Sequence, residues 1–292
     1  MKNPLKQKHK FSIAIPASLV SDIPHLREKS IKIGLVSRAA SIFCVDEIVI
    51  FSDLCEVDQT QDINLIATIL SYMETPQYLR RRIFKLRPEL RYVGVLPPLR
   101  TPHHPLLNRI KDLEVGEYRE GVVVSSLKEH SFVDIGVERP ILIPKNKLAT
   151  NTRVTVKITE LGKLPKAVIV SQKETNKYWG YRVTVSKKAF DKFIKKRRFD
   201  LVIATSRRGT SITEIIDELS RRMKNARTIL LAFGAPTQGL YEIVSQKKLE
   251  LNEMADFIIN TIPNQGTETV RTEEALYSSL AILNLLTIDT RI

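Results

Sequence analysis

The chain has 292 residues, of which 43% are hydrophobic and 27% charged, as is typical of a globular protein with one large or two ordinary domains. Lys and Arg outnumber Asp and Glu by 46 to 32, which gives a net charge of +14. No apolar run reaches the roughly 18 residues that cross a bilayer, and two cysteines, Cys44 and Cys55, exclude a disulfide framework or zinc site and predict a reducing, cytoplasmic setting.

Strand-like and helix-like segments alternate over the first hundred residues. Apolar, β-branched runs that predict strands stand at 11–15, 47–51 and 92–96. The stretch 23–43 predicts a helix between the first two strands, and 63–84 predicts one or two helices, interrupted at Pro76. This βαβαβ order predicts a parallel sheet.

The pattern changes after a proline-rich segment, 96–106, which predicts a linker with His103 and His104 exposed. Short strand-like segments follow, separated by Gly, Pro and Asn turns. Five such strands predict a small β-barrel, for which the OB-fold is the commonest architecture of this size. The spacing of Gly116, Tyr118 and Gly121 resembles that of S1-type or OB RNA-binding barrels. A purely structural barrel is the alternative.

Helix and strand alternate again from about residue 176. The predicted elements are a basic helix at 183–198, a strand at 199–206, strands ending near 234 and 263, and helices from 240 and over 272–286. The barrel therefore reads as an insertion. We expect a split α/β domain formed by 1–101 and 176–292, with 102–175 as the inserted barrel.

The positive charge is clustered, which favours a polyanionic partner such as RNA. One cluster consists of Arg80, Arg81, Arg82, Lys85, Arg87 and Arg91. The other consists of Lys187, Lys188, Lys192, Lys195, Lys196, Arg197 and Arg198. Solvated helix faces, a generally basic proteome or adaptation to heat would explain the same charge.

Glycine-bearing loops follow three of the predicted strands. Gly234 and Gly239 lie between a strand and a helix, and Gly266 lies between the last strand and the terminal helix. The loop at 204–211 also joins a strand to a helix. Because open α/β sheets bind ligands at the carboxyl ends of their strands, these loops predict a ligand pocket.

Three segments match, in order, the signatures of a known superfamily. The first has Gly34 and Arg38, with Lys32 where the superfamily has Asn and Cys44 where Gly often stands; the second has Gly234, Gly239 and Leu240, with Pro236 in place of an acid. The third has Ile262 and Pro263, then Thr269, Val270, Arg271 and Thr272, with Arg271 where Asn is usual. Together they resemble the SPOUT RNA methyltransferases. The substitutions argue against the ribose 2′-hydroxyl subgroup and fit the archaeal and eukaryotic subgroup whose SPOUT domain carries an OB-like barrel.

This resemblance implies an α/β fold with a SPOUT-type parallel sheet and a C-terminal trefoil knot, plus the inserted barrel. It also implies S-adenosyl-L-methionine as cofactor, an RNA partner, a homodimer, and neither a metal nor a membrane. The reaction expected is methylation of a base in rRNA, with N3 of uridine as an acceptor.

The same resemblance implies the site residues. The expected cofactor-binding residues are Thr205, Arg208, Phe233, Gly234, Gly239, Asn260, Thr261, Ile262, Gln265, Gly266, Val270 and Thr272. Arg208 is expected to pair with the methionine carboxylate, and Asn260 and Gln265 to hydrogen-bond ribose or adenine, unless both are ordinary turn residues. Glycines at 234 and 239 would allow close approach of the backbone.

The expected catalytic residues are Arg38, Arg271 and Glu268. Arg38 would contact substrate phosphate or stabilise charge on the attacked base, unless it only snorkels from an apolar helix face. Glu268, or alternatively Glu273, would accept the proton of uridine N3, and Arg271 would lower the pKa of the acceptor.

Two other classes of function stay open at this point. A non-catalytic RNA-binding or ribosome-assembly factor that retains the fold would explain the Asn and Glu missing from the signatures. A phosphate-binding metabolic enzyme would explain the glycine loops, but neither the charge nor the barrel.

Overall fold

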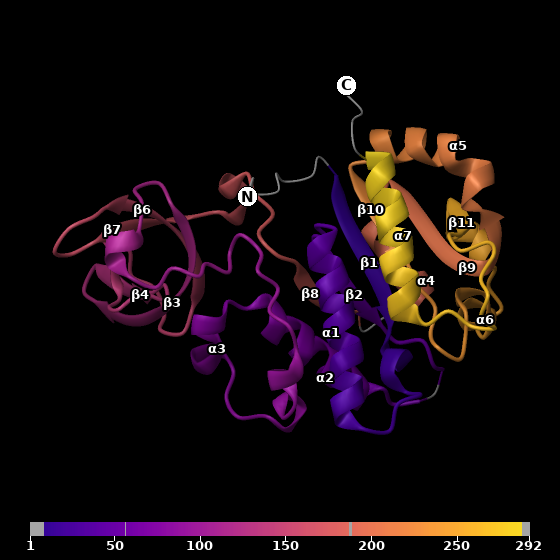
Figure 1. Ribbon diagram of the computed structural model, residues 1–292, viewed down its shortest axis with the longest axis horizontal. Coiled ribbons are helices and arrows are strands. Elements are labelled where there is room, and N and C mark those ends of the chain that lie inside the picture. The colour runs from indigo at the N-terminus through magenta and orange to yellow at the C-terminus, as the bar shows by residue number, and fades with distance from the viewer. Residues whose placement is uncertain (1–8, 56, 187–188, 288–292) are drawn as a thin grey trace. The chain divides into compact units, whose positions relative to one another are not determined.

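The computed structural model describes residues 9–55, 57–186 and 189–287 (Figure 1). The described chain divides into two compact units. The α/β unit comprises the described parts of 9–71, 89–97 and 181–287, and the barrel unit comprises 72–88 and 98–180.

The α/β unit is built on a six-stranded parallel sheet, as the βαβ pattern predicted, with the order β11-β9-β10-β1-β2-β8. The strands are β1 (Lys10–Pro16), β2 (Glu47–Phe51), β8 (Arg182–Ser186), β9 (Leu201–Ser211), β10 (Thr228–Ala232) and β11 (Phe257–Asn260). Every residue of β2 is buried, and so is every residue of β1 after Lys10. Such unbroken burial is what central strands of a parallel sheet require, because both faces are covered.

Two predicted elements are wrong. The run 92–96 contains a single 3₁₀ turn, Val93–Val95, because Gly94 and the following Pro97 interrupt its short apolar pattern. The second neighbour of β2, beside β1, is instead β8, which overlaps the start of the segment 183–198 that was expected to be helical; helix α4 (Phe190–Arg197) begins only after it. The alternating valines of β8 carry this strand signal. Lys187 and Lys188 lie outside the described residues.

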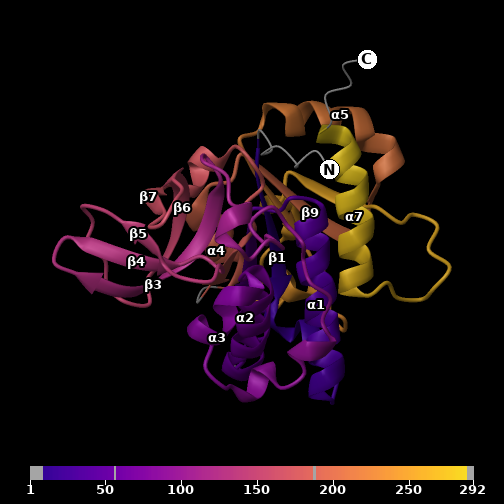
Figure 2. The ribbon, with the colours of Figure 1, turned by 60° about the vertical axis from the view of Figure 1, so that its left-hand side comes forward.

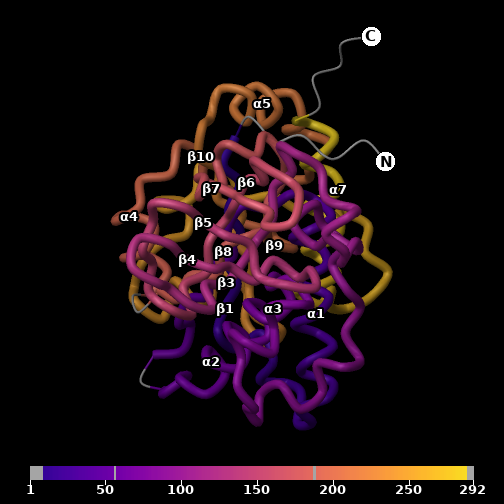
Figure 3. The backbone as a smooth tube through the Cα atoms, turned by 90° about the vertical axis from the view of Figure 1, so that its left-hand side faces the viewer, coloured from indigo at the N-terminus to yellow at the C-terminus, as the bar shows by residue number. Residues whose placement is uncertain are grey.

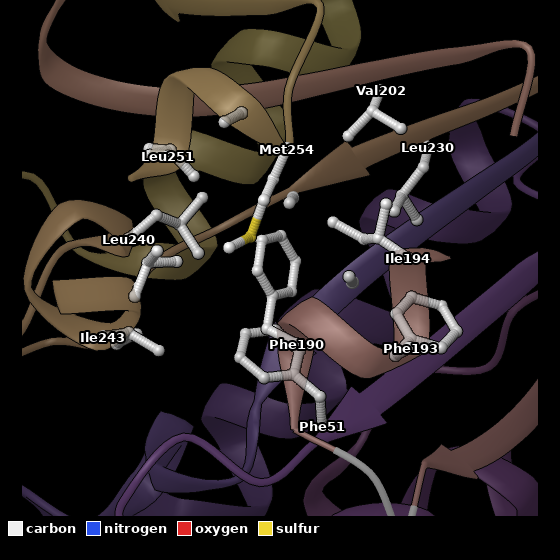
Figure 4. Packing of buried hydrophobic residues seen from close by; sticks show 14 of the residues in the cluster. Phe51, Phe190, Phe193, Ile194, Val202, Leu230, Leu240, Ile243, Leu251 and Met254 are labelled. Atoms are coloured by element: carbon white, nitrogen blue, oxygen red, sulfur yellow. The ribbon is translucent and has the colours of Figure 1, made fainter. Parts of the chain in front are cut away.

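Helices cover both faces of the sheet (Figures 1 and 2). The helices of the α/β unit are α1 (Leu26–Ile42), α2 (Thr60–Glu74), α4, α5 (Ile212–Asn225), α6 (Leu240–Ser245) and α7 (Thr272–Thr287), except that the last three residues of α2 belong to the barrel unit. On one face, α4 and α6 pack over alternate strand residues, and the rings of Phe51 and Phe190 lie 4.9 Å apart (Figure 4). Ile13 and Ile48 point to the other face and are fully buried, where α1 and α7 pack side by side.

The barrel unit holds the predicted five-stranded barrel, which is closed (Figure 3). Its strands are β3 (Tyr118–Leu127), β4 (His130–Asp134), β5 (Ile141–Ile143), β6 (Arg153–Glu160) and β7 (Lys166–Val170). They follow the order β3-β4-β5-β7-β6, and all pairs are antiparallel except β5 with β7. Inward-facing aliphatic side chains such as Val123, Val133 and Val156 fill the interior. Helix α3 (Gln77–Ile83) belongs to the same unit.

A network of buried charges supports one side of the barrel. Glu120 is fully buried and accepts hydrogen bonds from Trp179 Nε1 at 2.6 Å and Thr155 Oγ1 at 2.5 Å. Arg153 donates from Nε to Glu120 at 2.6 Å and from its terminal nitrogens to Glu74 at 2.7 and 2.9 Å. Because each buried carboxylate is paired and hydrogen-bonded, the network avoids the cost of an isolated buried charge.

The expectation that His103 and His104 are exposed is wrong. Both Nε2–H groups donate to the backbone oxygen of Glu74, at 2.9 and 2.7 Å, and His103 is fully buried with its ring 5.9 Å from that of Trp179. The proline-rich segment is therefore packed against the barrel unit and does not run free. Burial, reinforced by the neighbouring His103, lowers the pKa of His104 to about 3, so its imidazole is neutral.

Within residues 9–55, 57–186 and 189–287, no helix combines the length and apolarity needed to cross a membrane. Over the same described ranges, no group of three or more His, Cys, Asp or Glu side chains is placed to hold a metal ion.

Candidate functional site

The carboxyl ends of β9, β10 and β11 surround a pocket of about 390 Å³ in the α/β unit. These strands are parallel neighbours, so the loops that follow them meet at one edge of the sheet. The volume lies within the ~300–1,000 Å³ of small-molecule sites. Three chain segments line it, at 205–208, 233–242 and 259–275.

The first segment is a local excursion of β9. Ile258 and Ile259 are consecutive residues of β11, but they pair with Ala204 and Thr210 of β9. Residues 205–209 of β9 therefore bulge out of the pairing with β11. The excursion ends at Gly209, where an added Cβ would lie 2.7 Å from the backbone oxygen of Ile258. Only glycine fits such a close approach, and it turns 205–208 toward the pocket.

The second segment is a tight turn closed by two glycines. The Ala235 N–H donates to the oxygen of Gln238 at 2.8 Å, and a Cβ on Gly234 would lie 2.9 Å from Gly239 Cα. The backbones therefore touch where both side chains are absent. Gly266 is different: nothing lies within 4 Å of its added Cβ, and it does not line the pocket.

The third segment is held by side-chain amides. Asn260 Nδ2 donates to the oxygen of Arg207 at 3.0 Å, while Asn260 Oδ1 accepts from the Ile262 N–H at 3.0 Å. Gln265 Nε2 donates to the oxygens of Thr267 and Glu268 at 2.8 and 3.0 Å. Both amides therefore stabilise the loops through hydrogen bonds to the backbone. This matches the alternative in the sequence analysis, that Asn260 and Gln265 are ordinary turn residues.

Helix α7 is tied to the second segment at its first residue. Thr272 is buried, and its Oγ1 donates to the backbone oxygen of Gly234 at 3.1 Å. The start of α7 and the turn at 234–239 consequently form one wall of the pocket.

Two charged residues that the sequence analysis missed also line the pocket. Arg207 donates to the backbone oxygen of Glu268 at 2.7 Å and so joins the first segment to the third. Glu242 forms an ion pair with Arg208, whose guanidinium also lies 4.7 Å from the centre of the Tyr241 ring. Glu242 could have been found from the sequence, because it stands three residues after Gly239 at the start of a predicted helix, where an acid is favoured.

Most of the expected cofactor residues gather in this pocket. Those that line it are Thr205, Arg208, Phe233, Gly234, Gly239, Asn260, Thr261, Ile262, Gln265, Val270 and Thr272. Of the expected catalytic residues, Glu268 lines the pocket, whereas Arg38 and Arg271 do not. Arg271 is exposed, and its backbone N–H donates to the carboxylate of Glu274 at 2.9 Å.

Arg38 lies on α1 and is half-buried. Its charge acts on Tyr277 of α7, where it opposes the larger effect of burial that raises the pKa of that phenol. Glu273, the alternative proton acceptor, is buried and paired with Lys32 at 3.6 Å. Neither Arg38 nor Glu273 is among the residues that line the pocket of the same chain.

Comparison with known proteins adds independent information. A family model described as "Putative RNA methyltransferase" matches residues 10–283. The 28S rRNA (uridine-N(3))-methyltransferases of Drosophila melanogaster and Homo sapiens are 33% and 34% identical to this chain over 94% of its length. The chain spans 61% of the fly protein and 77% of the human one. An uncharacterized protein of Haloarcula marismortui is 32% identical, over 94% of this chain and 98% of its own length.

Proposed function

Because this chain belongs to the RNA methyltransferase family whose model spans residues 10–283, we propose that it methylates a base of rRNA with S-adenosyl-L-methionine as donor. The acceptor we propose is N3 of a uridine, the atom named in the fly and human relatives. The observation that carries the proposal is the convergence of three loops on one pocket at the carboxyl ends of β9, β10 and β11.

The residues of the pocket suit the proposed donor. The turn between Gly234 and Gly239 offers backbone groups with no Cβ in front of them, and Phe233 and Ile262 offer apolar surface to an adenine ring. When bound, S-adenosyl-L-methionine supplies a methyl group made electrophilic by its sulfonium. The protein then has to hold the acceptor in line with that methyl group, which is a task of positioning.

Carboxylates at the pocket can take the proton that uridine N3 must lose. Glu268 and Glu242 both line it, but Glu242 is already paired with Arg208. We propose Glu268 as the proton acceptor, with Arg207 fixing its backbone. Arg208 would meet the methionine carboxylate by exchanging its Glu242 partner, and Arg271 would place positive charge near the attacked base.

We further propose that the protein acts as a homodimer through α1. Ile31, Leu35 and Ile42 are exposed large apolar residues, and they recur at helical spacing along one face. Arg38 stands between Leu35 and Ile42 on that face. A second copy packed there would receive Arg38, which explains how a catalytic arginine can lie outside the pocket of its own chain.

The finer fold assignment is also a proposal. The order of the three signature segments, and the meeting of the second and third of them at one sheet edge, support a SPOUT domain with a C-terminal trefoil knot. The barrel order β3-β4-β5-β7-β6, with its single parallel pair, supports an OB-like barrel that helps to bind RNA. A cytoplasmic setting remains the prediction made from the two cysteines.

Isothermal titration with S-adenosyl-L-methionine, followed by mass spectrometry of nucleosides from treated rRNA, tests the function. We expect saturable binding and 3-methyluridine in the digest. Binding of RNA with neither donor binding nor methyl transfer would favour the non-catalytic assembly factor instead.

A further inference from the structure

The barrel unit carries a run of cations around α3 that the pocket does not use. Between Gln77 and Arg87 the chain has five cations, Arg80, Arg81, Arg82, Lys85 and Arg87, and no acid. The structure separates them into two groups, one bound within the protein and one turned to solvent.

Two of the arginine side chains form hydrogen bonds within the barrel unit. Arg80 donates to the backbone oxygens of Thr75 and Met73 at 2.9 and 3.1 Å. Arg82 donates from Nε to Asp134 of β4 at 2.7 Å. The charge of Arg82 is thereby paired with a carboxylate of the barrel.

The other three cations are exposed, and two of them flank an exposed apolar residue in the sequence. Arg81, Lys85 and Arg87 are exposed, and none forms an ion pair within the residues that the structure describes. Leu86 stands between two of them with a relative exposure of 105%, so that its side chain is wholly in solvent. We call these four residues, 81 and 85–87, the α3 ridge.

Helix α3, which carries Arg81 and leads into 85–87, is held against the barrel strands. The Tyr78 hydroxyl donates to the backbone oxygen of Glu120 at 2.8 Å. Its ring covers Gly136 so closely that a Cβ there would lie 2.4 Å from the ring. Together with the Arg82–Asp134 pair, these contacts fix α3 against β3 and β4, and Figure 2 shows the helix beside the barrel strands.

We propose that the α3 ridge is a binding surface for the sugar-phosphate backbone of RNA. Exposed cations without an acidic partner in the described part of the chain, one on α3 and two in the segment that follows it, can neutralise phosphates, and the exposed leucine between Lys85 and Arg87 can contact ribose or an unstacked base. The ridge would recognise the charge and spacing of the RNA phosphates and would not discriminate between base sequences. This inference rests on the proposed function, since it assigns to the RNA substrate a contact outside the methyl-transfer pocket.

The test compares two triple variants of equal net charge. In the first, Arg81, Lys85 and Arg87 are each changed to Gln. In the matched control, three exposed cations of the α/β unit, Arg221, Lys224 and Lys248, are changed to Gln. A labelled oligouridine of about 20 nucleotides is titrated with each protein at several salt concentrations.

We expect the ridge variant to lose about 2 from the slope of log Kobs against log salt, since each phosphate contact with a single strand contributes roughly 0.7. The control should keep the wild-type slope, and both variants should bind S-adenosyl-L-methionine as the wild type does. Equal slopes for the ridge variant and the wild type would overturn the role of the ridge in RNA binding. The proposed function is tested separately: it would be overturned if the wild-type protein transferred no methyl group to rRNA.

Discussion

Lys32 of α1 and Glu273 of α7 form a buried ion pair, with Nζ 3.6 Å from Oε2 and side-chain exposures of 4% and 8%. Lys32 also donates to Asp22 at 3.4 Å. The pair fixes the first turn of α7, in which Thr272 touches Gly234. Lys32, which stands where the SPOUT signature has Asn, therefore supports the wall of the pocket.

Changing Lys32 to Met should destabilise the protein by about 3 kcal/mol, because the carboxylate of Glu273 would stay buried without a cation. Urea unfolding at neutral pH measures this loss. The double change of Lys32 to Met and Glu273 to Leu should recover most of it, since no charge is left unpaired. A single variant as stable as the wild type would contradict the role of the pair.

Changing Gly234 to Ala should weaken binding of S-adenosyl-L-methionine at least tenfold. The new Cβ would press on the backbone at Gly239, which cannot move without opening the turn. Gly266 provides the matched control, because an added Cβ there meets nothing within 4 Å. Calorimetric titration with S-adenosyl-L-methionine measures the affinity of both variants. Equal affinities of the Gly234 and Gly266 variants would mean that the donor does not bind at the turn.

Changing Arg38 to Ala should abolish methyl transfer and leave donor affinity within a few-fold, because Arg38 does not line the pocket. If Arg38 acts across a dimer, mixing this variant with the Gly234→Ala variant should restore part of the activity. The restored activity comes from mixed dimers that hold one intact pocket and one intact arginine. An inactive mixture, with dimers exchanging, would count against action across the interface.

Changing Glu268 to Gln should lower kcat at neutral pH by about 100-fold, the scale of general base catalysis. The deficit should shrink as pH rises, since more of the acceptor nitrogen is then already deprotonated. Changing Glu242 to Gln should instead mainly alter the affinity for the donor, by freeing Arg208. The pH profiles of kcat for the two variants separate the roles, and a flat deficit for the Glu268 variant would remove it as the base.

Stability should fall as the solution is acidified below about pH 6.5. The pKa of His104 is lowered from 6.5 to about 3 by burial and by His103. The unfolded chain therefore takes up this proton first, and the folded state loses about 2 kcal/mol between pH 6.5 and 5. The pKa of Glu74, lowered to about 2 because hydrogen bonds from His103 and Arg153 outweigh its burial, adds a further loss below pH 4.5.

Urea unfolding at pH 7 and pH 5 measures this dependence. A His104→Asn variant lacks the buried imidazole and should show a smaller difference between the two pH values. An unchanged difference would assign the acid sensitivity to other groups.

The sequence predicted the parallel sheet and the small barrel, and most of the cofactor-binding residues that it suggested lie around one pocket. Glycines 234 and 239 were informative because a tight turn leaves a local signal that survives in a single sequence. Strand β8 was missed because its partner β2 is far away in the sequence: the paired residues Glu47 and Arg182 are 135 positions apart. The barrel lies between them in the chain, so no local pattern indicates that they pair.

The buried histidines could not be foreseen for a related reason. Their partners are the backbone oxygen of Glu74 and the ring of Trp179, which the fold brings to them from distant parts of the chain. The same holds for Arg207, whose contact with Glu268 depends on the excursion of β9. Sequence patterns report local periodicity, whereas these contacts depend on tertiary structure.

The closure of Tyr78 over Gly136 also bears on engineering of the barrel. A graft cut at 102–175 would leave behind the phenol that covers Gly136 and the carboxylate of Glu74 that neutralises Arg153. The transplanted strands would then expose an apolar notch, and the half-buried guanidinium of Arg153 would keep Glu120 but lose its second carboxylate partner. Chimaeras that exchange this module between relatives should therefore carry residues 72–88 along with the strands.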